Sequence, residues 1–360
     1  MPVVYEFPGF VDVHVHFRDP GVPEAETTAS GLAAARRGGF AAVVTMPNTS
    51  PAGDSVEWVN ENLSAELEGT RIIPSACITR GRLGKEVAEL EKLAEAGAAF
   101  FTDDGSYVED GRVMEEAMRR SAALGMVVCQ HAMTWRDGLS PAANVIRDCA
   151  LARSLGLGVI PVEVETDAIR RDLSLCRVTG CRLHIQHIST AEGVELVRTA
   201  QREGLPVTAE ATPHHLLLTC DEIAVDDANF KMAPPLGNRE DRAELRKAVK
   251  DGILMFATDH APHPAAKKNL GFAKSANGII GLETAIPITY QVMVEEEGMS
   301  VEDWAKAWYE MPRTIIADPG RITGVTRVVT GERRKVEVDT FASRSRNCPY
   351  DGLEFSAWPL

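Results

Sequence analysis

The chain has 360 residues, enough for one large barrel domain or two smaller domains. Its 44% hydrophobic and 25% charged residues are typical of a soluble globular protein, and its formal net charge of -14 argues against general binding to a nucleic-acid backbone. No apolar run is long enough for a membrane helix, and no signal peptide is recognisable. The seven cysteines are scattered without a CxxC pair, which favours a reduced, cytoplasmic protein.

Short runs rich in Val, Ile and Phe are predicted to be strands, and segments with helical spacing lie between most of them. The eight predicted strands are 10–16, 41–46, 71–78, 98–102, 126–131, 182–188, 206–211 and 253–257. Predicted helices that end on glycine are 25–39, 85–97, 112–125, 162–180 and 191–204. Eight alternating units predict an α/β fold, a (β/α)8 TIM barrel. An open doubly wound sheet is the weaker alternative, because no glycine-rich phosphate loop follows the first strand.

Two segments differ from this repeating pattern. About fifty residues separate Ala132 from the sixth strand, so the fifth unit carries extra chain. The last part of the chain is predicted to be a strand-and-loop appendage. We therefore expect a barrel over 1–317 and a reduced C-terminal accessory segment over 318–360.

Every one of the nine histidines falls within a predicted strand or at its carboxyl end, which is where a (β/α)8 barrel carries its active site. His14 and His16 lie two apart on one strand, so alternation places both side chains on the same face. Further candidate ligands end other strands: Asp103 and Asp104, His131, His187 and Asp259. A single histidine is more often structural than functional, but this grouping is not typical of structural histidines.

Imidazole and carboxylate ligands without cysteine suit zinc, or a related divalent ion such as manganese or cobalt. Counting one aspartate from strand four, the six candidates exceed what one tetrahedral ion needs. The sequence therefore predicts one or two Zn²⁺ ions per chain, the pair bridged by a carboxylate. Such a pair can activate water and polarise a carbonyl group.

Two polar residues beside these ligands are candidate substrate anchors. Arg18 follows the histidine pair, and its guanidinium can bind a carboxylate through two hydrogen bonds. A surface salt bridge with Asp19 is the alternative. Asn48 follows the second strand in "TMPNTSP", where its amide could bind a substrate oxygen or simply form a turn.

At this point the motifs resemble those of the dihydroorotases in the amidohydrolase superfamily. The segments "PGFVDVHVHFRDPG", "TMPNTSP", "FFTDDGS", "TGCRLHIQHIST", "ATDHAPH", "GLETAIP" and "SRSRNCPYDG" follow in the family's order from about Pro8 to Gly352. The resemblance implies a metal-dependent (β/α)8 barrel. It implies reversible conversion of dihydroorotate to N-carbamoyl-aspartate in pyrimidine biosynthesis.

The resemblance also implies roles for individual residues. One metal would be held by His14, His16, Asp104 and Asp259, and the second by His131 and His187, with Asp104 bridging in place of the carboxylated lysine of other superfamily members. Asp103 remains the alternative bridge. Asp259 would accept the proton of the attacking water and deliver it to the ring nitrogen, and Arg18, Asn48 and His263 would hold the substrate carboxylate. The segment after strand eight is expected to be mobile and to close over the substrate.

The sequence also departs from the family pattern. Ala233 stands where an asparagine commonly precedes the paired prolines, and Gly237 where an arginine is usual. A backbone group or Asn238 is a conjectural substitute for the missing ring contact. The family's N-terminal accessory strands are not expected here, and the exposed edges of a truncated accessory domain would favour a homo-oligomer or a complex with aspartate transcarbamoylase.

Three functions remain open at this stage. The first is dihydroorotase. The second is another cyclic amidohydrolase, such as an allantoinase or a hydantoinase. Ala233 favours this function because it offers no side-chain hydrogen bond to a pyrimidine ring. Arg18 argues against it, because a substrate without a carboxylate needs no cation at that position. The third is a non-catalytic scaffold for a partner enzyme, against which all six candidate ligands argue.

Overall fold

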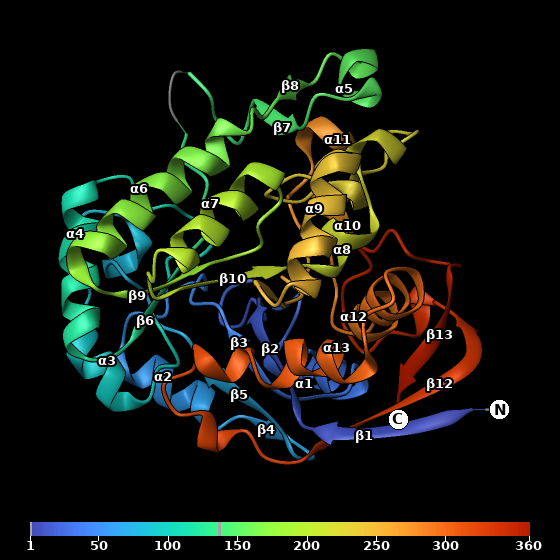
Figure 1. Cartoon of the computed structure of the whole chain (residues 1–360), viewed down its shortest axis with the longest axis horizontal. Helices are drawn as coiled ribbons and strands as arrows, with labels where there is room; N and C mark the ends of the chain where they lie inside the picture. Colours follow the sequence, from blue (N-terminus) through green and yellow to red (C-terminus); the bar gives the residue numbers. More distant parts are fainter. Residues whose placement is uncertain (1, 136–137) are drawn as a thin grey trace.

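Strands and helices alternate along most of the chain, giving a mixed α/β architecture (Figure 1). This computed structural model describes residues 2–135 and 138–360. The first sheet has the order β2-β3-β5-β4, formed by β2 (Phe10–Val15), β3 (Phe40–Thr45), β5 (Thr70–Pro74) and β4 (Glu66–Leu67). The second has the order β11-β10-β9-β6, formed by β11 (Leu254–Phe256), β10 (Val207–Ala211), β9 (Arg182–Ile185) and β6 (Val127–Gln130). All pairings are parallel except that of β4 with β5.

Single-residue bridges connect the two sheets. Phe101 pairs in parallel with Ala76 on one side and Val128 on the other, and Val15 pairs with His260 beyond β11. Seven of the eight predicted strands are observed, as β2, β3, β5, β6, β9, β10 and β11. The predicted strand at 98–102 is reduced to the bridging residue Phe101. Around this residue, Ala99 N–H donates to the Pro74 carbonyl oxygen and Ala76 N–H donates to the Phe100 carbonyl oxygen.

The predicted helices are all observed, with shorter bounds. They are α1 (Thr28–Arg37), α3 (Leu90–Ala96), α4 (Gly111–Ala123), α6 (Glu163–Thr179) and α7 (Ala191–Arg202). Thr27 begins α1 with a capping box, and Gly180 ends α6 in the left-handed conformation. The remaining helices are α2 (Val56–Leu63), α5 (Ala150–Leu155), α8 (Pro213–Leu217), α9 (Arg239–Lys250), α10 (Ala265–Lys268), α11 (Gly271–Lys274), α12 (Ala285–Thr289) and α13 (Val301–Tyr309). Among the described residues, no helix has both the length and the apolar character to cross a bilayer.

A separate antiparallel sheet joins the two ends of the chain (Figure 1). It has the order β1-β12-β13, formed by β1 (Val3–Pro8), β12 (Val325–Lys335) and β13 (Glu354–Pro359). Strand β1 is not among the predicted strands, so the accessory sheet draws on the N-terminus as well as on the tail. Its partners lie more than 300 positions away, and only the tertiary fold brings them together.

The extra chain of the fifth unit forms a projection at the top of Figure 1. It contains the short parallel strands β7 (Asn144–Ile146) and β8 (Gly158–Val159), with α5 between them. Buried Arg147 donates to the carbonyl oxygens of Ile160 and Pro161 and to Ser189 Oγ. The base of the projection is thereby attached to the loop that follows β9.

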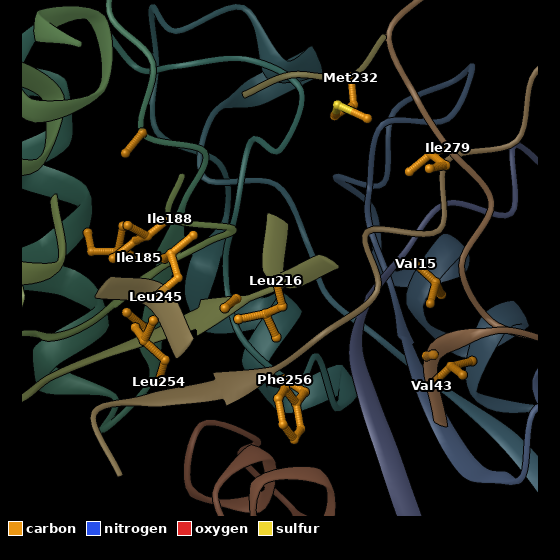
Figure 2. Close-up of a cluster of buried hydrophobic side chains, with 14 of the residues drawn as sticks. Val15, Val43, Ile185, Ile188, Leu216, Met232, Leu245, Leu254, Phe256 and Ile279 are labelled. Carbon is orange, nitrogen blue, oxygen red and sulfur yellow. The ribbon is translucent and has the colours of Figure 1, made fainter. Parts of the chain in front are cut away.

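Buried aliphatic and aromatic side chains fill the space between strands and helices (Figure 2). Leu254 and Phe256 of β11 belong to the same cluster as Leu245 of α9, and Val15 of β2 to the same cluster as Val43 of β3. Full burial of each such side chain contributes roughly 1.5–3 kcal/mol relative to exposure. This packing fixes the strands whose carboxyl ends carry the polar residues described next.

Candidate metal centre and active-site pocket

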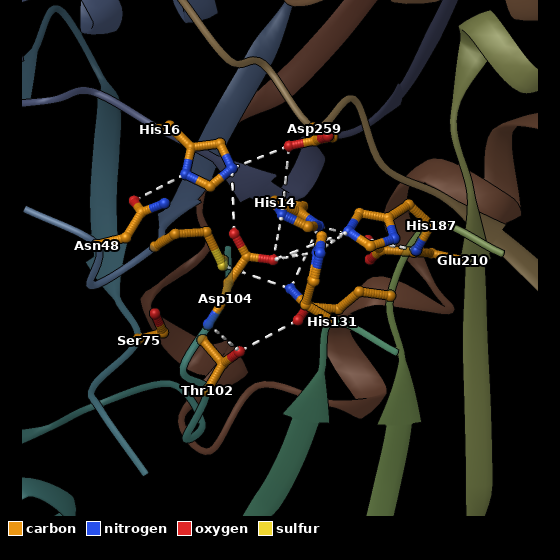
Figure 3. A network of polar contacts seen from close by, with 12 residues as sticks. His14, His16, Asn48, Ser75, Thr102, Asp104, His131, His187, Glu210 and Asp259 are labelled. Atoms are coloured by element: carbon orange, nitrogen blue, oxygen red, sulfur yellow. Dashed lines mark hydrogen bonds and ion pairs between the residues drawn. The ribbon is translucent and has the colours of Figure 1, made fainter. Parts of the chain in front are cut away.

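Six candidate ligands predicted from the sequence meet at the carboxyl ends of the parallel strands (Figure 3). They come from β2 and the residue after it, from the turn beyond Phe101, and from the ends of β6, β9 and β11: His14 and His16, Asp104, His131, His187 and Asp259. All but the half-buried His131 are buried.

Asp104 lies at the centre of this cluster. Its Oδ2 is 3.1 Å from His14 Nε2, and its Oδ1 is 3.2 Å from His16 Nε2. The same Oδ2 lies 3.7 Å from His131 Nδ1 and 3.9 Å from His187 Nε2. Asp259 Oδ1 completes the arrangement, 2.9 Å from His16 Nε2.

Asp103 lies outside the cluster. Its carboxylate accepts hydrogen bonds from the backbone N–H groups of Ile78 and Thr79 and from the Thr79 hydroxyl. It therefore stabilises the loop after β5, and of the two aspartates only Asp104 faces the histidines.

The donor set fits a divalent metal. Two triads offer one ligand atom each with all three atoms within 4.8 Å of one another: His14, His16 and Asp259, and His14, Asp104 and His187. Nδ1 of His131 belongs to neither triad but lies 2.8 Å from His187 Nε2. Buried His14 Nε2 and Asp104 Oδ2 have no hydrogen-bond partner among the described residues, although they are close together. A buried polar atom without a hydrogen-bond partner destabilises the fold unless a ligand binds it.

The electrostatics of the cluster point the same way. Burial alone would lower the pKa of His14, but Asp104, Glu210 and Asp259 raise it well above its usual value. Conversely, burial alone would raise the pKa of Asp104, yet His14 and His16 hold it well below its usual range. The carboxylates thus behave as anions that require nearby positive charge, which a bound cation would also supply.

Glu210 is a site residue that the sequence analysis missed. Its Oε1 lies 2.6 Å from His14 Nδ1, and its Oε2 lies 2.9 Å from His184 Nε2. A carboxylate can only accept, so His14 carries its proton on Nδ1 and leaves Nε2 facing Asp104. The available signal was an acidic side chain within the hydrophobic strand "VTAEA".

Asp12 is a second missed residue, and it joins β2 to the end of β11. Its Oδ1 accepts from the backbone N–H groups of His14 and Thr258, and its Oδ2 accepts from the Thr258 hydroxyl. Asp259, immediately after Thr258, has a φ of 48°, in the region that non-glycine residues rarely adopt. The Asp12 contacts hold this strained residue in position beside His16.

A cavity of about 270 Å³ opens beside the cluster and is lined by the predicted substrate residues Arg18, Asn48 and His263. Arg18 Nε donates to the Pro262 carbonyl oxygen, and no acidic group of the described chain lies within salt-bridge distance of its guanidinium. Asp19 instead accepts from Thr28, so the alternative of an Arg18–Asp19 surface pair is wrong. Burial lowers the pKa of Arg18 to about 10, which leaves a cation at neutral pH.

Asn48 and His263 each have a protein partner as well as a place on the cavity wall. Asn48 Oδ1 lies 2.9 Å from His16 Nδ1, and since this oxygen accepts, His16 Nε2 is left for Asp104 and Asp259. His263 Nε2 donates to the Asn277 carbonyl oxygen at 2.7 Å. Burial and the Arg18 cation lower the pKa of His263 to about 3, so its ring is neutral at physiological pH.

The remaining wall of the cavity is largely apolar. It includes Met133, Trp135, Pro141 and Ala233. Asn238, the conjectural substitute for the missing asparagine, is the N-cap of α9, where its side chain accepts from the backbone N–H groups of Glu240 and Asp241. Asn238 is not among the cavity-lining residues, so that conjecture is wrong.

Solved structures with a similar fold indicate the class of protein. Among solved structures, the fold is similar to L-hydantoinase from Arthrobacter aurescens (TM-score 0.81, 25% identity, 99% of this chain and 83% of that one). It is also similar to the Saccharomyces cerevisiae dihydroorotase in complex with 5-fluoroorotic acid (TM-score 0.76, 17% identity, 99% and 98%). A strand-end cluster of histidines and aspartates on such a fold defines an enzyme of the cyclic amidohydrolase class.

Sequence relatives define the family within that class. The family model described as dihydro-orotase-like matches residues 5–193. Dihydroorotases from Geobacillus sp. (strain WCH70) and Listeria monocytogenes serovar 1/2a are each 40% identical, over 98% of this chain and 84% of the relative. The chain belongs to the dihydroorotase family.

Proposed function

We propose that the chain catalyses the reversible hydrolysis of (S)-dihydroorotate to N-carbamoyl-L-aspartate, a step of pyrimidine biosynthesis. The observation that carries this proposal is the partly buried cation of Arg18, which lines the same cavity as the histidine–aspartate cluster and forms no salt bridge with a carboxylate among the described residues. A substrate that combines a cyclic amide with a carboxylate matches both features. The family membership of the chain supports the same reaction.

The cluster would hold one or two Zn²⁺ ions, with His14, His16, Asp104 and Asp259 around one and His131 and His187 around the other. The triad of His14, His16 and Asp259 supports the first group, and Asp104 Oδ2, which lies 3.1 Å from His14, 3.7 Å from His131 and 3.9 Å from His187, suits a bridge. When bound, the metal would activate water and polarise the ring carbonyl. Glu210 and Asn48 would fix the tautomers of His14 and His16 for this task.

Asp259 would act as the general base and then as the general acid. In hydrolysis it accepts a proton from the attacking water as the new C–O bond forms, and it returns the proton to the ring nitrogen as the C–N bond breaks. Arg18 would bind the substrate carboxylate through two hydrogen bonds. Asn48 would complete the carboxylate site through its amide nitrogen. His263 would join it as a hydrogen-bond donor once its ring is protonated or has turned away from the Asn277 carbonyl.

The broader organisation of the chain is proposed from its strand pairing, its exposed strand edge and its cysteines. The bridges at Phe101 and between Val15 and His260 support closure of the parallel strands into a (β/α)8 barrel. Residues 318–360 form a reduced accessory segment together with β1, so the expectation that no N-terminal accessory strand would be present is wrong. The free edge of β1, with Val3 and Val4 48% and 56% exposed, supports a homo-oligomer or a complex with aspartate transcarbamoylase. All seven cysteines are free, which is consistent with a cytoplasmic location.

A hydantoinase-like activity is the second candidate. Ala233 and the apolar wall beside it favour this activity, since they offer no side-chain hydrogen bond to a pyrimidine ring. Arg18 favours dihydroorotate, because hydantoin and allantoin have no carboxylate for it to bind.

The test is a parallel assay of zinc-loaded protein on dihydroorotate, hydantoin and allantoin. We expect hydrolysis of dihydroorotate, and we expect it to be abolished in Asp259→Ala. Activity that survives Asp259→Ala would refute the role of Asp259. Preference for hydantoin or allantoin would replace the proposed function, and inactivity on all three would revive the scaffold hypothesis.

A further inference from the structure

Two buried lysines lie behind the segment that follows β11. Lys268 ends α10 and is 4% exposed, and Lys231, in the loop before α9, is 3% exposed. Among the described residues, neither ammonium group lies within salt-bridge distance of a carboxylate, and Asp227 acts on Lys268 only from further away. Buried lysines without an anionic partner are rare, because taking the charge out of water is costly.

Both lysines donate hydrogen bonds to backbone carbonyl oxygens. Lys268 Nζ donates to the carbonyls of Lys231 at 3.1 Å, Ala276 at 3.0 Å and Gly278 at 2.9 Å. An ammonium group has three N–H donors, so these three carbonyls match its full capacity. Lys231 Nζ in turn donates to the carbonyls of Ala273 and Ser275.

These contacts surround the turn that forms part of the cavity wall. Asn277 and Gly278 both line the cavity, and Asn277 lies between the two carbonyls that Lys268 binds on this turn. The Asn277 carbonyl accepts from His263 Nε2. Lys268 thus binds the carbonyls on both sides of Asn277, and the Asn277 carbonyl binds the His263 ring.

Other bonds reinforce the same turn. Gly278 N–H donates to the Lys231 carbonyl, and Asn347 Nδ2 donates to the Gly278 carbonyl. Burial, with the neighbouring Lys231 ammonium adding to it, lowers the pKa of Lys268 to about 7. The protein thus carries a costly buried group whose hydrogen bonds, among the described residues, go to this turn and to the loop of Lys231.

We propose that Lys268 is a positioning residue that locks the Ala276–Gly278 turn, and through it His263, in the conformation that forms the substrate-carboxylate end of the pocket. Lys231 supports the same lock from the preceding loop. Such a lock would hold the segment in place in the free enzyme, whereas the sequence predicts a mobile lid, and the exchange experiment below decides between the two. The effect on catalysis rests on the proposed function, whereas the structural lock does not.

The test compares Lys268→Met with Lys267→Met in the full-length, zinc-loaded protein. Lys267 is the adjacent, exposed lysine of the same short helix, so it controls for loss of charge. In Lys268→Met we expect KM for dihydroorotate to rise about tenfold while kcat changes less than about threefold, because the metal ligands are untouched. Hydrogen exchange of the amides over 273–280 should accelerate in Lys268→Met alone.

Lys268→Gln is a second variant, to be used in case Lys268→Met does not fold. It retains two N–H donors, so its KM should lie between those of the wild type and Lys268→Met. Unchanged exchange over 273–280 in both Lys268 variants would overturn the lock. Faster exchange with unchanged KM, or an equal fall in kcat, would overturn the positioning role. If the wild type did not hydrolyse dihydroorotate, the proposed function would fail, and the exchange comparison would still decide the lock.

Discussion

The carboxylate of Glu210 lies 2.6 Å from Nδ1 of His14, so the ring that contributes to both ligand triads is oriented from β10 and not from its own strand β2. Glu210 also accepts from His184 Nε2 and from the His187 backbone N–H. Burial alone would raise the pKa of Glu210, but His14 and His184 lower it to about 2. This group is therefore ionised at neutral pH and ready to hold the His14 proton.

Glu210→Gln should weaken metal binding. The amide N–H₂ would face the N–H of His14 or His184, so the His14 tautomer would no longer be fixed. Loss of such a partner typically lowers metal affinity by about 10–100-fold. Competition with a chelator would measure this effect, and the exposed Glu195→Gln serves as the control. An affinity equal to that of the wild type would show that His14 needs no such partner.

Asp104→Asn and Asp103→Asn should have different consequences. Asp104→Asn removes the carboxylate nearest to the histidines, so we expect loss of bound metal and of activity with a folded chain. Asp103→Asn weakens the hydrogen bonds to Ile78 and Thr79, so we expect a lower free energy of unfolding, by about 1–3 kcal/mol, with metal still bound. Metal analysis and denaturant unfolding separate the two. If Asp103→Asn lost the metal instead, the assignment would be reversed.

Arg18→Met should impair substrate binding while leaving the metal in place. A buried carboxylate that loses its charged partner costs about 2–5 kcal/mol, which corresponds to a fall in kcat/KM of more than about tenfold. Steady-state kinetics measure this change, with the exposed Arg80→Met as control. An unaltered kcat/KM would remove Arg18 from the substrate site.

The two directions of the reaction should depend oppositely on pH. Hydrolysis needs ionised Asp259, which is present above its pKa, and cyclisation needs the protonated acid, which is present below it. Burial alone would raise this pKa, but His14 and His16 lower it from its usual value. We therefore expect hydrolysis to be lost only towards acidic pH, and cyclisation to decline as the pH rises. Profiles of kcat/KM measured in both directions test this, and parallel profiles would contradict the assignment.

Local patterns in the sequence predicted much of the site. Alternation along "VDVHVH" placed His14 and His16 on one face, and the position of His131, His187 and Asp259 after hydrophobic runs predicted their common edge. Helical spacing that ended on glycine predicted α1, α3, α4, α6 and α7. These features could be predicted because hydrophobic periodicity and helix-ending residues depend on neighbours in the sequence.

Contacts between distant segments were not predictable in this way. The pairing of β1 with β12, the hydrogen bond between Asn48 and His16, and the carbonyl contacts of Lys268 join segments whose spacing carries no periodic signal. Asp103 and Asp104 are adjacent and chemically identical, so only the backbone direction after Phe101 distinguishes the structural carboxylate from the one in the cluster.

By itself, the sequence determined the class of chemistry, the ligand types and the family, because each depends on residue identity and local spacing. The tertiary structure decided which aspartate faces the histidines, which acid orients His14 and what holds the cavity wall. Those outcomes depend on side-chain directions and on contacts between residues 243 and 246 positions apart in the sequence, and such relationships exist only once the chain has folded.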